Sequence, residues 1–138
     1  YNLSAPGDGG LQEAQVALSS ANILALSATP ITLVPAPAAG KIIAVERIIG
    51  KFVRTATAYA NGGALEFRYT NGSGAKVTAD MAATTITGAE GTAYSSVAGV
   101  TTELVPVAAA LIITNATAPF ISGTGTAQFT TLYKIVTP

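Results

Sequence analysis

Turn-forming residues recur along the whole sequence and divide it into short segments. The 138 residues include 14 glycines and 7 prolines, and the runs between them are rich in Val, Ile, Thr and aromatic residues. Short runs of this composition between turn residues are typical of β-strands, and about eight can be counted here. Strands do not alternate with helical patterns, which argues against a parallel α/β sheet. We therefore predict an all-β protein: an antiparallel β-sandwich, jelly-roll-like, with about eight strands and an N-terminal arm.

The segment 41–53 is the strongest strand candidate. Apolar residues crowd both of its faces, which indicates a strand buried on two sides or one with a bulge near Gly50. Other strands are predicted at 15–18, 31–34, 102–107, 110–114 and 127–136. Two segments fit either a helical turn or a strand, 19–26 and 80–87, and three glycines mark loops between 88 and 99.

The clearest turn is Asn61-Gly62, because these residues readily take the positive φ values of a tight hairpin. It is predicted to join a strand at 57–60 to a strand at 64–70. In the second strand Leu65, Phe67 and Tyr69 alternate with Glu66 and Arg68, which predicts a half-buried strand whose two charges pair. A second turn at 71–74 would return the chain to 75–78.

The expected domain organisation is simple. Residues 1–12 contain Pro6 and several glycines and are predicted to form a flexible N-terminal arm, either a frayed end or a segment lying on a neighbouring subunit. Residues 13–138 would form a single β-sandwich domain, a length that allows a real core. The sequence has no apolar run long enough to span a membrane and no pattern of a signal peptide at its start.

Catalytic and metal-binding chemistry is poorly supported. The chain has no histidine and no cysteine, which removes the commonest general base, the commonest metal ligand and any disulfide. Its acidic residues are scattered and form no motif: Asp8, Glu13, Glu46, Glu66, Asp80, Glu90 and Glu103. Neither serine-nucleophile nor phosphate-loop motifs occur. We predict no enzyme activity, no catalytic, cofactor-binding or metal residues, and no cofactor.

Charge is sparse and balanced. Charged residues make up 10% of the chain, and the formal net charge is zero, whereas nucleic-acid binding needs a basic excess. A local basic patch remains open at Lys41, Arg47, Lys51 and Arg54. Five aromatic residues at strand positions are predicted to lie in the core, with an exposed stacking platform as the alternative: Tyr59, Phe67, Tyr69, Phe129 and Tyr133. A surface with so few charges is best explained if partner subunits cover much of it.

Two stretches of the sequence, 23–45 and 57–69, resemble small structural proteins of tailed bacteriophages. They include Leu33-Val34-Pro35-Ala36-Pro37-Ala38-Ala39-Gly40-Lys41 and Ala64-Leu65-Glu66-Phe67-Arg68-Tyr69. The resemblance covers roughly 20–138 and is looser in the second half. It implies a capsid decoration or cement protein, which binds the outside of a phage capsid and bridges capsomers. The implied partners are the major capsid protein and further copies of the chain, with a homotrimer favoured, and neither nucleic acid nor membrane.

The implied location is the capsid surface of the virion, after synthesis in the host cytoplasm. An alternative is a tail, fibre or head-fibre component that recognises a host surface through exposed aromatic residues or polar loops such as 88–99 or 115–126. A non-viral surface or filament subunit is a third possibility. No catalytic residues come with the resemblance.

Overall fold

The computed structural model describes residues 10–99 and 105–138, which contain nine strands and two short helices. The strands are β1 (Leu11–Leu18), β2 (Ile31–Val34), β3 (Ile42–Arg54), β4 (Tyr59–Asn61), β5 (Leu65–Tyr69), β6 (Gly91–Ala98), β7 (Leu111–Asn115), β8 (Phe120–Ser122) and β9 (Thr126–Val136). The helices are α1 (Ser20–Leu24) and α2 (Thr84–Thr87).

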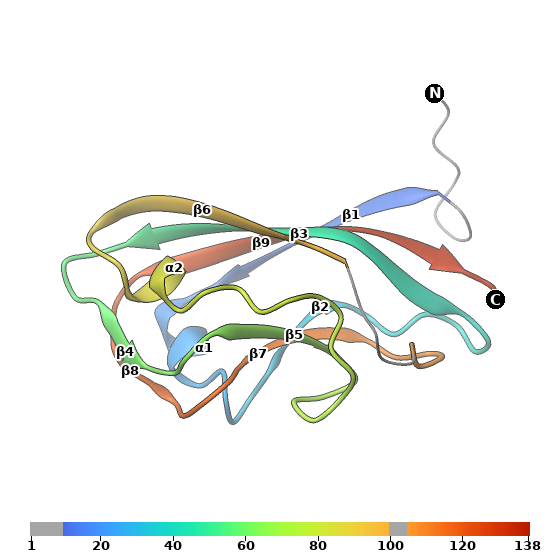
Figure 1. The fold of residues 1–138 in the computed structure, drawn as a ribbon, viewed down its shortest axis with the longest axis horizontal. Coiled ribbons are helices and arrows are strands. Elements are labelled where there is room, and N and C mark those ends of the chain that lie inside the picture. The colour runs from blue at the N-terminus through green and yellow to red at the C-terminus, as the bar shows by residue number, and fades with distance from the viewer. Residues whose placement is uncertain (1–9, 100–104) are drawn as a thin grey trace.

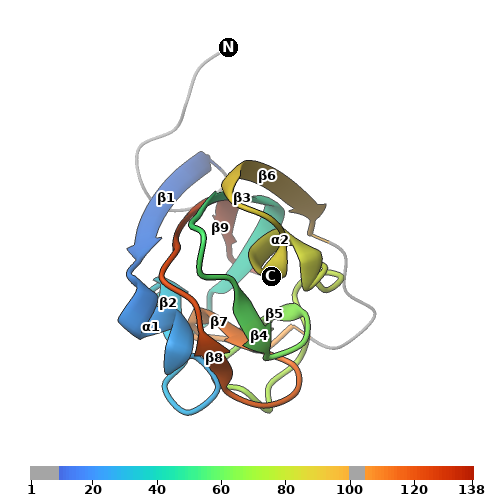
Figure 2. The same ribbon diagram turned by 90° about the vertical axis from the view of Figure 1, so that its left-hand side faces the viewer.

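The strands form two stacked layers with a small third sheet at one end (Figure 1). One layer is a four-stranded sheet with the order β1-β9-β3-β6, and the other is a three-stranded sheet with the order β2-β7-β5. Strands β4 and β8 pair with each other and close the end that faces the viewer in Figure 2. All these pairings are antiparallel. The prediction of an all-β antiparallel sandwich is therefore confirmed.

Three phenylalanines join the two layers. Phe129 of β9 meets Phe52 of β3 with the ring centroids 5.6 Å apart, and it meets Phe67 of β5 at 5.8 Å, both edge to face. This geometry matches the preferred electrostatics of aromatic pairs. Gly50 leaves room for the cluster, because a Cβ there would lie 2.8 Å from the Phe52 ring. The core is thus centred on the two long middle strands of the larger sheet.

Thr131 is one of five polar or charged residues that are buried in the described part of the chain. Thr131 of β9 is fully buried, and its Oγ1 has no hydrogen-bond partner within 10–99 and 105–138. We expect Thr131→Val to raise the free energy of unfolding by about 1 kcal/mol, because a methyl group replaces a hydroxyl that has lost its water contacts. Urea unfolding would measure the change, with Thr130→Val on the opposite face as the control. A loss of stability would mean that the hydroxyl has a partner, such as a buried water.

The Asn61-Gly62 turn was predicted to close a hairpin, and this prediction is wrong. Asn61, Gly62 and Gly63 do have positive φ angles of 68°, 51° and 73°. However, β4 pairs with β8 while β5 pairs with β7, so the turn carries the chain from one sheet to another. Buried Asn115 holds the turn in place, since its Nδ2 donates to the Gly62 carbonyl at 2.8 Å.

Strand β5 is almost fully buried rather than half-buried. Glu66 is only 8% exposed, although it points away from the core. The chain that follows the turn at 71–74 folds back along β5, and Val77 N–H donates to the Phe67 carbonyl at 2.9 Å. Isolated bridges also pair Arg68 with Lys76 and Leu65 with Met81. The returning segment therefore covers both the free edge and the outer face of β5.

Other boundaries differ from the sequence-based expectations. The irregularity in β3 lies at Glu46, between Val45 and Arg47, and not near Gly50. The glycine-marked region 88–99 was predicted as loop but contains β6, since its residues alternate between half-buried and exposed as an edge strand requires. Of the strand predicted at 102–107, residues 105–107 are not in a strand and the rest falls outside the described residues.

The two ambiguous segments both contain helices. Helix α1 begins at a capping box, in which Asn22 N–H donates to Ser19 Oγ at 3.2 Å and Ser19 N–H donates to Asn22 Oδ1 at 3.0 Å. Helix α2 is a single turn. Strand β1 starts at Leu11, opposite Lys134 of β9, and thus includes the last two positions assigned to the arm. The remainder of that arm, 1–9, lies outside the described residues.

Candidate docking surface

The four-stranded sheet has one face toward the core and one toward solvent, which we call the outer face. Phe52, Ile48 and Phe129 are buried on the inner side, so the alternate residues of each strand point outward. The outer face comprises Leu11, Glu13, Gln15 and Ala17 of β1; Thr126, Gln128, Thr130, Leu132 and Lys134 of β9; Arg47, Ile49, Lys51 and Val53 of β3; and Thr92, Tyr94, Ser96 and Ala98 of β6.

Strand register arranges these side chains in rows across the sheet. One row runs Gln128, Lys51, Tyr94, and the next runs Thr130, Ile49, Ser96. A third row runs Leu132, Arg47, Ala98. Apolar, hydroxyl and amide side chains thus surround the cations Lys51 and Arg47. No described segment crosses this face (Figure 1). Such a mixed and extended surface is suited to contact with another protein rather than to chemistry.

The four basic residues singled out in the sequence do not form one patch. Arg47 and Lys51 share the outer face, and Arg47 Nη1 donates to Ser96 Oγ at 3.0 Å. Arg54 lies at the far end of β3, where Nη1 donates to the Thr84 carbonyl at 3.3 Å. Lys41 lies beyond the other end, with Nζ 3.2 Å from Thr137 Oγ1. Arg54 and Lys41 are therefore separated from Arg47 and Lys51 by their positions at or beyond the ends of β3.

Two open hollows lie along the outer face. One, of about 550 Å³, is lined by Leu18, Ser19, Asn22, Lys51, Val53 and Gln128, among others. The second, of about 260 Å³, is lined by Arg47, Ile49, Tyr94, Ser95 and Ser96. Both are shallow, so they fit side chains of a partner better than an enclosed small molecule.

Three of the acidic residues lie in separate places. Glu46 lies 3.6 Å from Lys134, Glu13 is on β1, and Glu90 is exposed before β6. Within residues 10–99 and 105–138, no three potential metal ligands come together. Asp8 and Glu103 fall outside the described residues. In the same part of the chain, no helix has the length and apolar character to cross a membrane.

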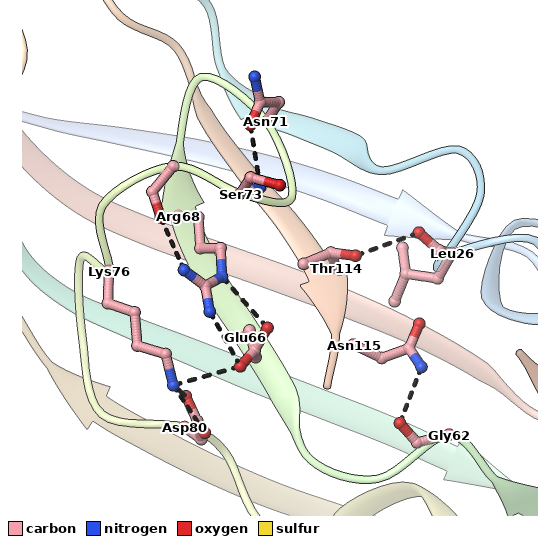
Figure 3. A network of polar contacts seen from close by, with 11 residues as sticks. Leu26, Gly62, Glu66, Arg68, Asn71, Ser73, Lys76, Asp80, Thr114 and Asn115 are labelled. Carbon is pink, nitrogen blue, oxygen red and sulfur yellow. Dashed lines mark hydrogen bonds and ion pairs between the residues drawn. The ribbon is translucent and has the colours of Figure 1, made fainter. Parts of the chain in front are cut away.

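Glu66 and Asp80 belong to a structural network (Figure 3). Arg68 Nε lies 3.1 Å from Glu66 Oε1, Lys76 Nζ lies 3.2 Å from Glu66 Oε2, and the same Nζ lies 2.8 Å from Asp80 Oδ1. Arg68 Nη1 also donates to the Gly74 carbonyl at 2.6 Å. The predicted pairing of Glu66 with Arg68 is confirmed, and the network fastens the returning segment onto β5.

The pKa values in this network follow from its charges. Burial raises the pKa of Glu66, but hydrogen bonds and attraction from Arg68 and Lys76 outweigh it, so the pKa lies below its ordinary value. Hydrogen bonding to Asp80, with a smaller contribution from Glu66, raises the pKa of Lys76 despite some desolvation. Both groups are therefore held in their charged forms near neutral pH.

The five aromatic residues considered for a stacking platform are all buried, so the core interpretation is correct for them. Tyr59 donates to the Gly125 carbonyl at 2.6 Å and Tyr69 to the Ile43 carbonyl at 2.7 Å. Burial raises the pKa of both phenols. The sequence analysis missed Tyr94, which is 70% exposed on the outer face. The alternation of side-chain types along 92–97 could have indicated a strand with Tyr94 on its exposed face. The glycines on either side of this segment suggested a loop instead.

Comparison with known proteins identifies no family. No family model matches the chain, and no curated protein matches it. Among solved structures, the chain is similar to one described as "Cyanophage Pam1 capsid asymmetric unit", with 17% sequence identity and a TM-score of 0.49 over 97% of this chain and 93% of that chain. A TM-score below 0.5 does not establish a shared fold. The architecture and the exposed sheet define the class as an all-β sandwich with a candidate docking surface.

Proposed function

We propose that this chain is a structural protein of a phage virion, a decoration or cement protein that binds the outside of the capsid and bridges capsomers. The observation that supports this proposal most is the outer face, where four strands present a broad mixture of apolar, polar and isolated charged side chains to solvent. A mixed surface of this kind is suited to a protein interface. The sequence resemblance to small phage structural proteins supports the same role.

The mechanism would be multivalent binding. A protein that contacts several capsid subunits at once gains affinity because the contacts are linked, so no single contact needs to be strong. The partners proposed are the major capsid protein and further copies of this chain, with the trimer favoured by the resemblance. The chain from the start of β1 onward would act as a single domain, and the residues before β1 as an arm that lies on a neighbouring subunit. Synthesis would take place in the host cytoplasm, and no catalysis, cofactor, nucleic acid or membrane enters this role.

A second candidate is a tail, fibre or head-fibre component that recognises a host surface. Tyr94 supports it, because the exposed ring lines a hollow together with Arg47 and Ser96. An aromatic ring beside hydrogen-bond donors is suited to binding polar ligands such as sugars. The proposed recognition loops fit less well, since 91–98 is a strand and 115–126 contains β8.

The copy number of this chain in purified virions tests the proposal. Quantitative mass spectrometry against the major capsid protein should give comparable amounts of the two chains. A few copies per particle would favour the tail or fibre role, and absence from particles would refute both.

A surface variant tests whether the outer face makes the contact. Thr130 lies in the middle of that face, between Gln15 of β1 and Ile49 of β3. We expect Thr130→Arg to weaken binding to empty capsids by about tenfold or more, because a long charged side chain there would hold the surfaces apart. Ala38→Arg, in an exposed loop, is the matched control. Equal capsid binding by the two folded variants would contradict a docking role for this face.

A further inference from the structure

Strand β6 is an edge with little protection against pairing. It is the outermost strand of its sheet, and on the side away from β3 the described residues pair only at its C-terminal end, where Thr78 forms a bridge with Gly99. Its eight residues include no charge and no proline, and its register with β3 is continuous, without a bulge. Alternate N–H and C=O groups along this edge are therefore available to another strand.

The other edge strands of the two larger sheets, β1, β2 and β5, are each protected in a recognised way. Strand β2 is four residues long, lies between Pro30 and Pro35, and has an irregular register with β7. Strand β5 is covered by the segment that pairs through Lys76 and Met81. Strand β1 has the exposed charge of Glu13 in its middle. Proline, an irregular register, a covering segment and charge are the features that keep edge strands from pairing, and none of them occurs along Gly91–Val97 of β6.

An antiparallel partner identical to β6 fits this edge in one register particularly well. In a two-fold pair, each outward residue must face another outward residue, because side chains alternate along both strands. Centring the pair on Ser95 satisfies this condition and pairs Ala93–Val97 with the same stretch of a second copy, clear of the bridge between Thr78 and Gly99. Tyr94 then faces Ser96 of the other copy, and the half-buried Ala93 faces Val97, which extends the inner apolar layer.

The charges on β3 are compatible with this register. The row that contains Lys51 and Tyr94 continues into Ser96 and Ile49 of the second copy. The row that contains Arg47 ends at Ala98, beyond the stretch that pairs with the second copy. Lys51 therefore shares a row with an apolar residue and not with a cation of the other copy. Centring on Tyr94 instead would place Lys51 of both copies in one row, and centring on Ser96 would align Lys51 with Arg47.

We propose that β6 pairs with β6 of a second copy about a two-fold axis at Ser95, so that two four-stranded sheets become one continuous antiparallel sheet. The contact is isologous, the commonest kind in homo-oligomers. It goes beyond the proposed function, because it depends only on this chain and holds whether or not the protein binds a capsid. This two-fold contact is separate from any contact that would form a trimer. Alone it yields dimers, and together with a trimer contact it yields hexamers.

Sedimentation of the purified chain tests the proposal without any capsid. We expect a dimer or hexamer at concentrations up to about 100 μM. Tyr94→Lys should raise the dissociation constant by about tenfold or more, because it places a charge at the pairing edge. Ile121→Lys is the matched control, since Ile121 is also an exposed apolar strand residue, on β8, and should leave assembly unchanged. A monomer, a trimer, or equal effects of the two variants would overturn the proposal.

A single cysteine tests the register. The chain has no cysteine of its own, and Ser95→Cys would place two thiols directly opposite each other, with their Cα atoms about 4.5–5.5 Å apart. Mild oxidation should then give a covalent dimer in high yield. Ser73→Cys, in an exposed turn, should stay largely monomeric on a denaturing gel. Equal cross-linking of both variants would refute pairing at Ser95, even if sedimentation detects a dimer.

Discussion

Replacing Phe129 by alanine is expected to lower the free energy of unfolding by about 3–5 kcal/mol, the largest effect of any single substitution considered. Phe129 is 1% exposed and contacts both Phe52 and Phe67, which belong to different sheets. The substitution removes both edge-to-face contacts and leaves a cavity between the layers. Long β-strands on either side limit how far the backbone can move to fill it.

Urea unfolding at equilibrium measures this effect. Ile121→Ala is the control, because Ile121 is 47% exposed and its loss should change stability by about 0.5 kcal/mol or less. If Phe129→Ala cost no more than the control, the three rings would not join the two layers as described.

Removing the carboxylate of Glu66 is expected to have the second largest effect. Glu66 is buried beside Arg68 and Lys76, so Glu66→Gln leaves two cations facing a neutral amide. A broken buried ion pair costs about 3–5 kcal/mol. Lys76 is 36% exposed at its side chain, and water will screen part of the loss, so we expect about 2 kcal/mol near neutral pH.

The Glu66 effect should depend on pH in a defined direction. The lowered pKa of Glu66 means that its stabilising contribution is fully present above the ordinary pKa of a glutamate and is lost as pH falls through the lowered value in the folded state. The difference between wild type and Glu66→Gln should therefore shrink on acidification. Glu46→Gln is the matched control, since its ion pair with Lys134 is exposed and should contribute about 0–1 kcal/mol. If the difference in unfolding free energy between wild type and Glu66→Gln did not change with pH, the Glu66 carboxylate would not be the source of the stabilisation.

Local sequence patterns predicted the parts of the fold that depend on a single segment. The strand at 31–34 has the predicted bounds, and the alternation of 127–136 correctly placed Phe129 and Tyr133 inside. Both segments are rich in β-branched residues, which favour strands.

Features that depend on partner segments were not predictable in the same way. The φ angles around Asn61-Gly62 matched the turn chemistry, but β4 pairs with the distant strand β8, whose Phe120 ring lies 5.9 Å from that of Tyr59. Glu66 is buried because the segment around Val77 folds over it, and nothing local to β5 signals that. The outer face was missed as a unit because its residues come from four separate strands.

The pairing of β1 with β9 has a consequence for how the chain reaches its native state. Gln12 and Tyr133 are neighbours although they are 121 positions apart, and β9 is also the main partner of β3. The central strand of the larger sheet is thus the last of the described strands to leave the ribosome, and β1 has no sheet partner before then. Contacts of such long range are formed slowly, because a long loop must close first. During synthesis the first strand therefore remains available to chaperones, or to a neighbouring nascent chain, until the sheet is completed.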